Sequence, residues 1–152
     1  MNEQTLKEQL FKHCQSQLAT RREAVDNILA NVALSLKEET KSSAGDKHET
    51  GRAMLQLERE NAGKQLAEIE KLEAILHRVP KTISSGPVHL GSVVMTSQNN
   101  YFISVPAGQI SIESTSFYAI GATSPIGQCL LSKQEGDEIR FRESVFTITS
   151  IF

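Results

Sequence analysis

The first 79 residues contain no proline, and apolar side chains recur through them at helical spacing. Up to residue 41 these side chains follow the period of an α-helix, which places them on one helical face. They are Leu6, Leu10, Cys14, Leu18, Val25, Ile28, Leu29, Val32 and Leu36. Such a narrow stripe is typical of a helix that packs against a single partner helix. We therefore expect a first helix from about Thr5 to Lys41, on the order of 50 Å long.

A second apolar stripe follows a short polar interval. It consists of Leu55, Ala62, Leu66, Ile69, Leu72 and Leu76. In the interval, Gly45 can adopt the left-handed conformation that ends a helix, and Asp46 can cap the next helix. The two stripes predict an antiparallel coiled-coil hairpin, or finger, over residues 1–79, with its tip near residues 42–49.

Residues 80–152 have a different character, because they hold all four prolines and six of the nine glycines. Alternating and β-branched segments predict short strands at 93–96, 101–105, 109–113, 117–120, 138–141 and 145–151. Ser124-Pro125 is typical of a helix start, since serine caps and proline fits the first helical position. The chain is thus predicted to be α+β, with a linker at 80–87 and a small antiparallel β domain carrying one short helix at 88–152.

Composition excludes several classes of protein. With 16 basic and 18 acidic residues, the net charge of −2 does not favour a strongly basic nucleic-acid clamp. The two cysteines, Cys14 and Cys129, are too few for a disulfide framework or a zinc site, which favours a reducing compartment. No apolar run is long enough to cross a bilayer, and the N-terminus lacks a signal-peptide core. We expect a cytoplasmic protein with no membrane partner.

Few residues form a pattern that indicates chemistry. No nucleophile–base set or phosphate-binding loop is present, and the four histidines, His13, His48, His77 and His89, are dispersed. The exception is the pair Asp46 and Glu49, which are three residues apart and share a face of a starting helix. One interpretation is a capping box. The other is a carboxylate pair offered to Mg²⁺, an incomplete ligand set that would be completed in another macromolecule and would bind Mg²⁺ only weakly alone. The capping box and the Mg²⁺ site are partly compatible interpretations of the same two carboxylates.

Several segments of the chain match one family. Residues 124–133 read SPIGQCLLSK and are followed by EGDEI at 135–139, while the tip reads GDxxE at 45–49. Residues 88–94 and 146–151 are similar to the first and last strands of the family's C-terminal domain. Over almost its whole length, the chain resembles the bacterial Gre transcript-cleavage factors of the GreA/GreB type.

The resemblance implies an FKBP-like C-terminal domain that docks at the rim of the RNA polymerase secondary channel, which the finger enters. By motif, Asp46 and Glu49 fall on the acids that help to hold a second Mg²⁺, shared with the polymerase, and to position water for cleavage of backtracked RNA. Ser124, Pro125 and Ile126 fall on a patch that we assign to docking. The implied partner is RNA polymerase, with nucleic acid contacted mainly through that complex and no small-molecule substrate. The chain would be an accessory factor rather than an enzyme.

The tip departs from the family pattern around the two acids. Lys47, Thr50, Arg52 and Ala53 stand where the family usually has Leu, Asn, Glu and Tyr. An alternative hypothesis is therefore a regulator that binds the polymerase channel without stimulating cleavage. A third hypothesis is a generic coiled-coil adaptor that is unrelated to the polymerase. The family-like sequence at residues 124–133 argues against this hypothesis.

Overall fold

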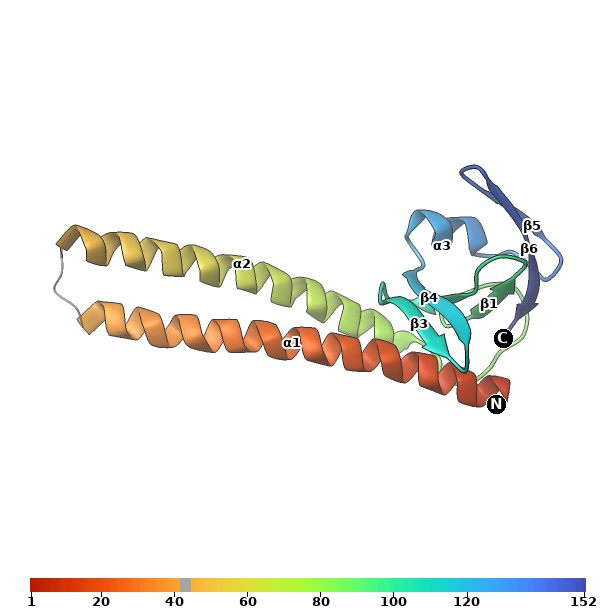
Figure 1. Cartoon of the computed structure of the whole chain (residues 1–152), viewed down its shortest axis with the longest axis horizontal. Coiled ribbons are helices and arrows are strands. Elements are labelled where there is room, and N and C mark those ends of the chain that lie inside the picture. The colour runs from red at the N-terminus through yellow and green to blue at the C-terminus, as the bar shows by residue number, and fades with distance from the viewer. Residues whose placement is uncertain (42–44) are drawn as a thin grey trace. The chain divides into compact units, whose positions relative to one another are not determined.

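The computed structural model describes residues 1–41 and 45–152, without the side chains of residues 40–48. Two long helices come first, α1 (Glu3–Lys41) and α2 (Gly45–Arg78), as Figure 1 shows. The residues of both predicted stripes are buried or half-buried, so the two predicted helices are confirmed. Within the described residues, no helix is long and apolar enough to cross a membrane.

The rest of the chain forms a six-stranded sheet with one short helix, in the order β3-β4-β2-β1-β6-β5. Its elements are β1 (Val93–Thr96), β2 (Tyr101–Ser104), β3 (Gly108–Ile112), β4 (Thr115–Gly121), α3 (Pro125–Leu130), β5 (Glu138–Phe141) and β6 (Ser144–Ile151). Each predicted strand and the predicted helix are present, so the α+β class is confirmed.

The sheet is mixed, which corrects the expectation of a wholly antiparallel one. Strands β2 and β4 pair in parallel, with Tyr101 opposite Tyr118 and Ser104 opposite Gly121. The reason is that β3 and β4 form a hairpin that folds back on β2 so that β4, not β3, lies beside it. Residue periodicity identifies strands, but it does not encode which of two hairpin strands pairs with a third.

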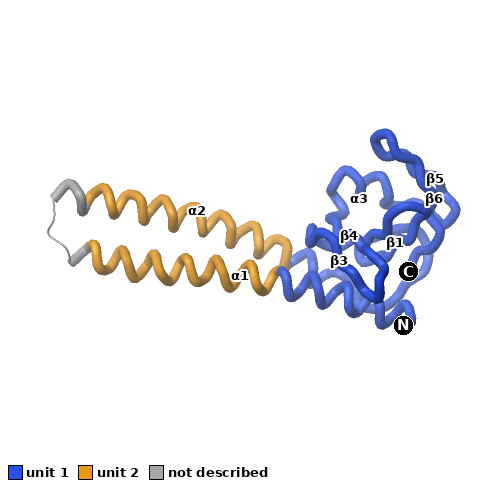
Figure 2. Tube along the Cα trace, in the orientation of Figure 1, with its two compact units in different colours: residues 1–17, 74–152 blue, residues 18–73 orange. Residues whose placement is uncertain are grey.

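Contacts divide the chain into two units, coloured separately in Figure 2. The first unit comprises residues 1–17 and 74–152, and the second comprises residues 18–73. The start of α1 and the end of α2 therefore belong with the sheet in this grouping. The functional division into a finger at 1–79, a linker at 80–87 and a docking domain at 88–152 stays a prediction.

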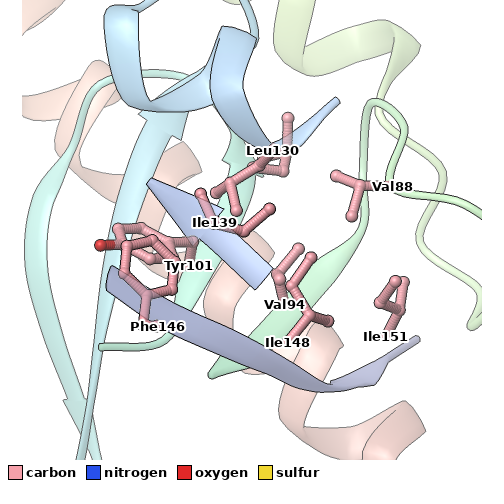
Figure 3. Close-up of a cluster of buried hydrophobic side chains, with 9 residues drawn as sticks. Val88, Val94, Tyr101, Leu130, Ile139, Phe146, Ile148 and Ile151 are labelled. Carbon is pink, nitrogen blue, oxygen red and sulfur yellow. The ribbon is translucent and has the colours of Figure 1, made fainter. Parts of the chain in front are cut away.

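A cluster of buried side chains organises the first unit (Figure 3). It contains Val88, Val94, Tyr101, Ile103, Leu130, Ile139, Phe146, Ile148 and Ile151. Backbone hydrogen bonds join the same segments: the N–H of Val88 donates to the carbonyl of Lys133 at 2.9 Å, and that of Ile148 donates to the carbonyl of Asp137 at 3.0 Å. The segments 88–94, 124–133, 135–139 and 146–151, which resemble parts of the Gre family's C-terminal domain, thus all contribute to one core.

The predicted linker is held by the first turns of α1. The side chain of Gln4 donates to the carbonyl of Lys81 and accepts from the N–H of Ile83, each at 3.0 Å. The Nζ of Lys7, whose side chain is 0% exposed, donates to the carbonyl of Thr82 at 2.9 Å. Residues 81–83 therefore follow a defined path along α1.

The second unit is held by a single seam between its two helical segments. Val25, Ala62 and Ile69 are buried there, and Ile28, Leu29 and Leu66 are half-buried beside them. The guanidinium of Arg22 on α1 also pairs with the carboxylate of Glu73 on α2. A two-helix seam covers only one face of each helix, so the remaining faces stay exposed.

Candidate functional site

The two acids of the predicted tip lie at the beginning of α2. Because α2 includes Gly45 and Asp46, Asp46 lies within the first helical turn rather than before it, and Gly45 belongs to the second helix rather than ending the first. Carboxylates are favoured within the first turn of a helix as well as at its cap. Glu49 is exposed, whereas the side chain of Asp46 lies outside the described residues. The pairing of the two carboxylates therefore stays a prediction.

The donor set at the tip suits a shared metal site rather than a complete one. Glu49 offers an exposed carboxylate, and Asp46 supplies a second one by sequence. Mg²⁺ takes six oxygen ligands and commonly shares them with phosphates and water. In the described part of the chain, no group of three or more His, Cys, Asp or Glu side chains is placed to hold a metal ion. The residues fit Mg²⁺ only if a partner brings the remaining ligands.

The three predicted docking residues have different surroundings at the start of α3, and their contact with a partner stays a prediction. The hydroxyl of Ser124 caps α3: it accepts from the N–H of Gly127 at 3.1 Å and donates to the carbonyl of Gly121 at 2.7 Å. Ile126 is half-buried against the core cluster. Pro125, at the first helical position, is exposed. Of the three, Pro125 is the most exposed.

The position of α3 is fixed by a close approach of backbone to backbone. A Cβ atom on Gly127 would lie 2.3 Å from the carbonyl oxygen of Gly121, so only glycine fits there. This contact sets α3 against the end of β4 and turns Pro125 and Gln128 outward as its exposed face. Gln128 was not among the predicted docking residues, although its spacing of three from Pro125 indicates a shared helical face.

The other candidate reactive groups serve the fold. Cys14 is 0% exposed, and its Sγ lies 3.6 Å from the Oγ of Ser104. Burial raises the pKa of the Cys14 thiol, while the weaker effect of the Ser104 hydrogen bond lowers it. A thiol with a raised pKa is a poor nucleophile, so the interpretation of Cys14 as a core residue is confirmed. His89 lies beside the linker, with its Nε2 3.0 Å from the Oγ of Ser84.

Comparisons with known proteins add little to this description. No protein-family model matches the sequence, and no curated protein matches it. Among solved structures, the chain is similar to the transcription factor Gfh1, with 22% sequence identity and a TM-score of 0.34 over 93% of this chain and 92% of that one. At that score the likeness carries no information about activity, which has to be inferred from the residues of this chain.

Proposed function

We propose that this chain is a transcription elongation factor that binds RNA polymerase at its secondary channel and stimulates cleavage of backtracked RNA. In this proposal it is an accessory factor of the Gre type, acting in the cytoplasm on the polymerase's own cleavage activity. Asp46 and Glu49 would complete a Mg²⁺ site in trans, and the β domain would dock at the channel rim.

The observation that carries the proposal is the position of the two acids. They lie three residues apart in the first turns of α2, directly after the short connection between two long helices. Glu49 is exposed, and Asp46 precedes it by three residues in the same helix. Support also comes from the β domain, since its core is built from the segments that resemble the family.

The role of each group follows from its chemistry. When bound, Mg²⁺ supplies charge neutralisation at the scissile phosphate and lowers the pKa of a bound water. The carboxylate of Glu49 is exposed and is therefore able to donate an oxygen lone pair to a metal ion held outside the chain. Pro125 and Gln128 offer an exposed docking face on α3, held rigid by the Ser124 cap.

The test uses a stalled, backtracked complex of the cognate RNA polymerase, with and without the protein. We expect shortened RNA and released 3′ fragments in its presence. Asp46→Asn with Glu49→Gln should reduce stimulated cleavage at least about 10- to 100-fold, the range that loss of outer-shell metal partners already costs. Polymerase binding should be retained, because both substitutions leave the β domain unchanged.

The matched control is Glu70→Gln, which removes one exposed carboxylate from the shaft of α2 and should leave cleavage unchanged. Unchanged cleavage in the tip variant would exclude a metal role for the acids. Absence of polymerase binding by the wild-type protein at micromolar concentration would exclude the whole proposal.

A second candidate function is a regulator that occupies the polymerase channel without stimulating cleavage. The observation that favours it is the altered tip, where Arg52 replaces an acid of the family pattern. In that case the wild-type protein would compete with a channel-binding factor for the polymerase but would release no RNA fragments. The same cleavage assay therefore separates the two functions.

A further inference from the structure

The second unit carries a groove on its surface, between its segments of α1 and α2, with a volume of about 790 Å³. The small side chains of Ser35 and Ala62 are among the residues that line it, and at Gly51 the Oε1 of Glu39 lies 3.1 Å from where a Cβ atom would be. On α2 the groove extends from Gly51 to Gln65, which is roughly 20 Å of helix. The described residues that line it all belong to residues 18–73, and Glu49 is not one of them.

Apolar side chains border this groove and remain uncovered. Met54 is 69% exposed and Leu57 is 58% exposed, and both line it. Ile28 and Leu55, which are half-buried, continue the apolar surface toward the seam. Met54 and Leu57 are three residues apart on α2 and therefore share a helical face, and exposed apolar side chains that gather on one face are a feature of interaction sites.

The charged side chains among the described residues that line the groove have the same sign. Of the described residues that line it, the charged ones are Glu38, Glu39 and Glu58, and none is Lys or Arg. A partner surface that combines apolar and basic residues would match both properties. A second copy of this chain placed symmetrically on the groove would instead set acid against acid, which disfavours self-association.

We propose that this groove binds a basic amphipathic helix of a partner protein. An amphipathic helix fills such a groove through anchors at positions i, i+3 or i+4, and i+7, and a groove of roughly 20 Å accommodates about four turns. Its apolar face would cover Met54 and Leu57, and its lysines or arginines would face Glu38 and Glu58. The proposal does not depend on the function proposed for the tip.

The test uses the full chain with ¹³C-labelled methionine methyl groups. The probe is a synthetic peptide of about 18 residues, five helical turns, made of Leu and Lys with the leucines on one face. We expect the Met54 signal to shift on titration while that of Met95, in the first unit, stays in place. A peptide with Glu in place of every Lys should produce no shift, because like charges would meet at the rim.

A matched pair of leucines tests the location. Leu57 and Leu34 are each 58% exposed and both belong to the second unit, but only Leu57 lines the groove. Leu57→Ser should weaken peptide binding about tenfold or more, as expected for loss of a buried leucine contact. Leu34→Ser should leave the affinity within about twofold, and both variants should fold, because neither leucine is in the core.

The acidic rim is tested by Glu38→Gln combined with Glu58→Gln. This variant should bind the Leu–Lys peptide more weakly at low salt and should lose most of the salt dependence of binding. Equal affinity for the Leu–Lys and Leu–Glu peptides, or equal effects of Leu57→Ser and Leu34→Ser, would overturn the proposal. A Met54 signal that moves with protein concentration alone would also overturn it, since a second copy would then be the occupant.

Discussion

The two units of this chain bury their side chains in different ways. In the first unit, buried residues come from the sheet, α3 and the base of the helical hairpin, and Phe102, Ile103 and Phe117 are 0% exposed. In the second unit, burial is confined to one seam, and buried residues such as Ala62 and Ile69 have half-buried neighbours. A closed core uses its apolar residues for its own stability, whereas a two-helix seam leaves apolar and acidic side chains on the surface for partners.

The largest expected effect on the free energy of unfolding comes from truncating one buried side chain in the core of the first unit and one in the seam of the second. Phe102→Ala should destabilise the first unit by about 3–5 kcal/mol, because a closed core leaves a cavity. Ile69→Ala should cost about 2 kcal/mol, the low end for its class, because its half-buried neighbours can close the gap. Urea unfolding would measure both, with tyrosine fluorescence reporting on the first unit, since Tyr101 and Tyr118 are the chain's two tyrosines and it has no tryptophan.

In the same urea experiment, the helical circular dichroism signal follows the unfolding of α1 and α2, because these two helices contain most of the helical residues. Val145→Ala, at an exposed position of the first unit, is the control and should change stability by less than about 0.5 kcal/mol. Equal losses for Phe102→Ala and Ile69→Ala would show that the seam packs as tightly as the closed core, which contradicts the comparison.

Adding a methyl group should have opposite effects in the two units. Gly127→Ala places a Cβ 2.3 Å from the carbonyl oxygen of Gly121 and should cost about 1–3 kcal/mol by overpacking. At Gly63, within α2, such a Cβ would come within 4 Å of no atom beyond its own chain neighbours and helix backbone, so Gly63→Ala should stabilise the helix by about 0.5–1 kcal/mol. Thermal unfolding of the two variants checks the signs, and a shift in the same direction for both would refute the prediction.

The sequence predicts the elements of both units well, for physical reasons. A stripe at helical spacing is a local property, so α1 and α2 follow from residues such as Leu10, Val32 and Ile69. The cap at Ser124 and the proline after it also act locally, and α3 begins where they predict. The parallel pairing of β2 with β4 escapes prediction, because it depends on how a hairpin folds back on a distant strand.

The candidate site is predicted only in part. The spacing of Asp46 and Glu49 predicts that both belong to one helix, and α2 includes both. Their use of a metal depends on ligands from another molecule, which no pattern within this chain encodes. The sequence does not predict the groove either, because Met54 and Leu57 lie outside the apolar stripe of α2 and their exposure beside a groove is seen only in the structure.

The smallest expected effect is the contribution of one buried charge, that of Lys7, to the pH dependence of the free energy of unfolding. Lys7, in the first unit, is 0% exposed, and burial lowers the pKa of its ammonium group below the ordinary lysine value. The folded chain therefore releases this proton at a lower pH than the unfolded chain does. Between the two pKa values the unfolded chain binds the extra proton, so the free energy of unfolding rises with pH until it levels off above the ordinary value of about 10.4.

Lys7→Met should remove this rise, so the free-energy difference between wild type and variant should change as the pH increases from about 7 to about 10.5, in favour of the wild type. Urea unfolding at a series of pH values measures the difference.

The control in the second unit is Lys64→Met, because the Lys64 side chain is 72% exposed, with its Nζ 3.8 Å from the Glu60 carboxylate. Lys64→Met removes an exposed ammonium group, so it separates the loss of a positive charge from the loss of a buried one. A flat difference for Lys7→Met would mean that water reaches its Nζ in the folded chain, and the contrast between a closed first unit and an open second unit would then fail at the base of the hairpin.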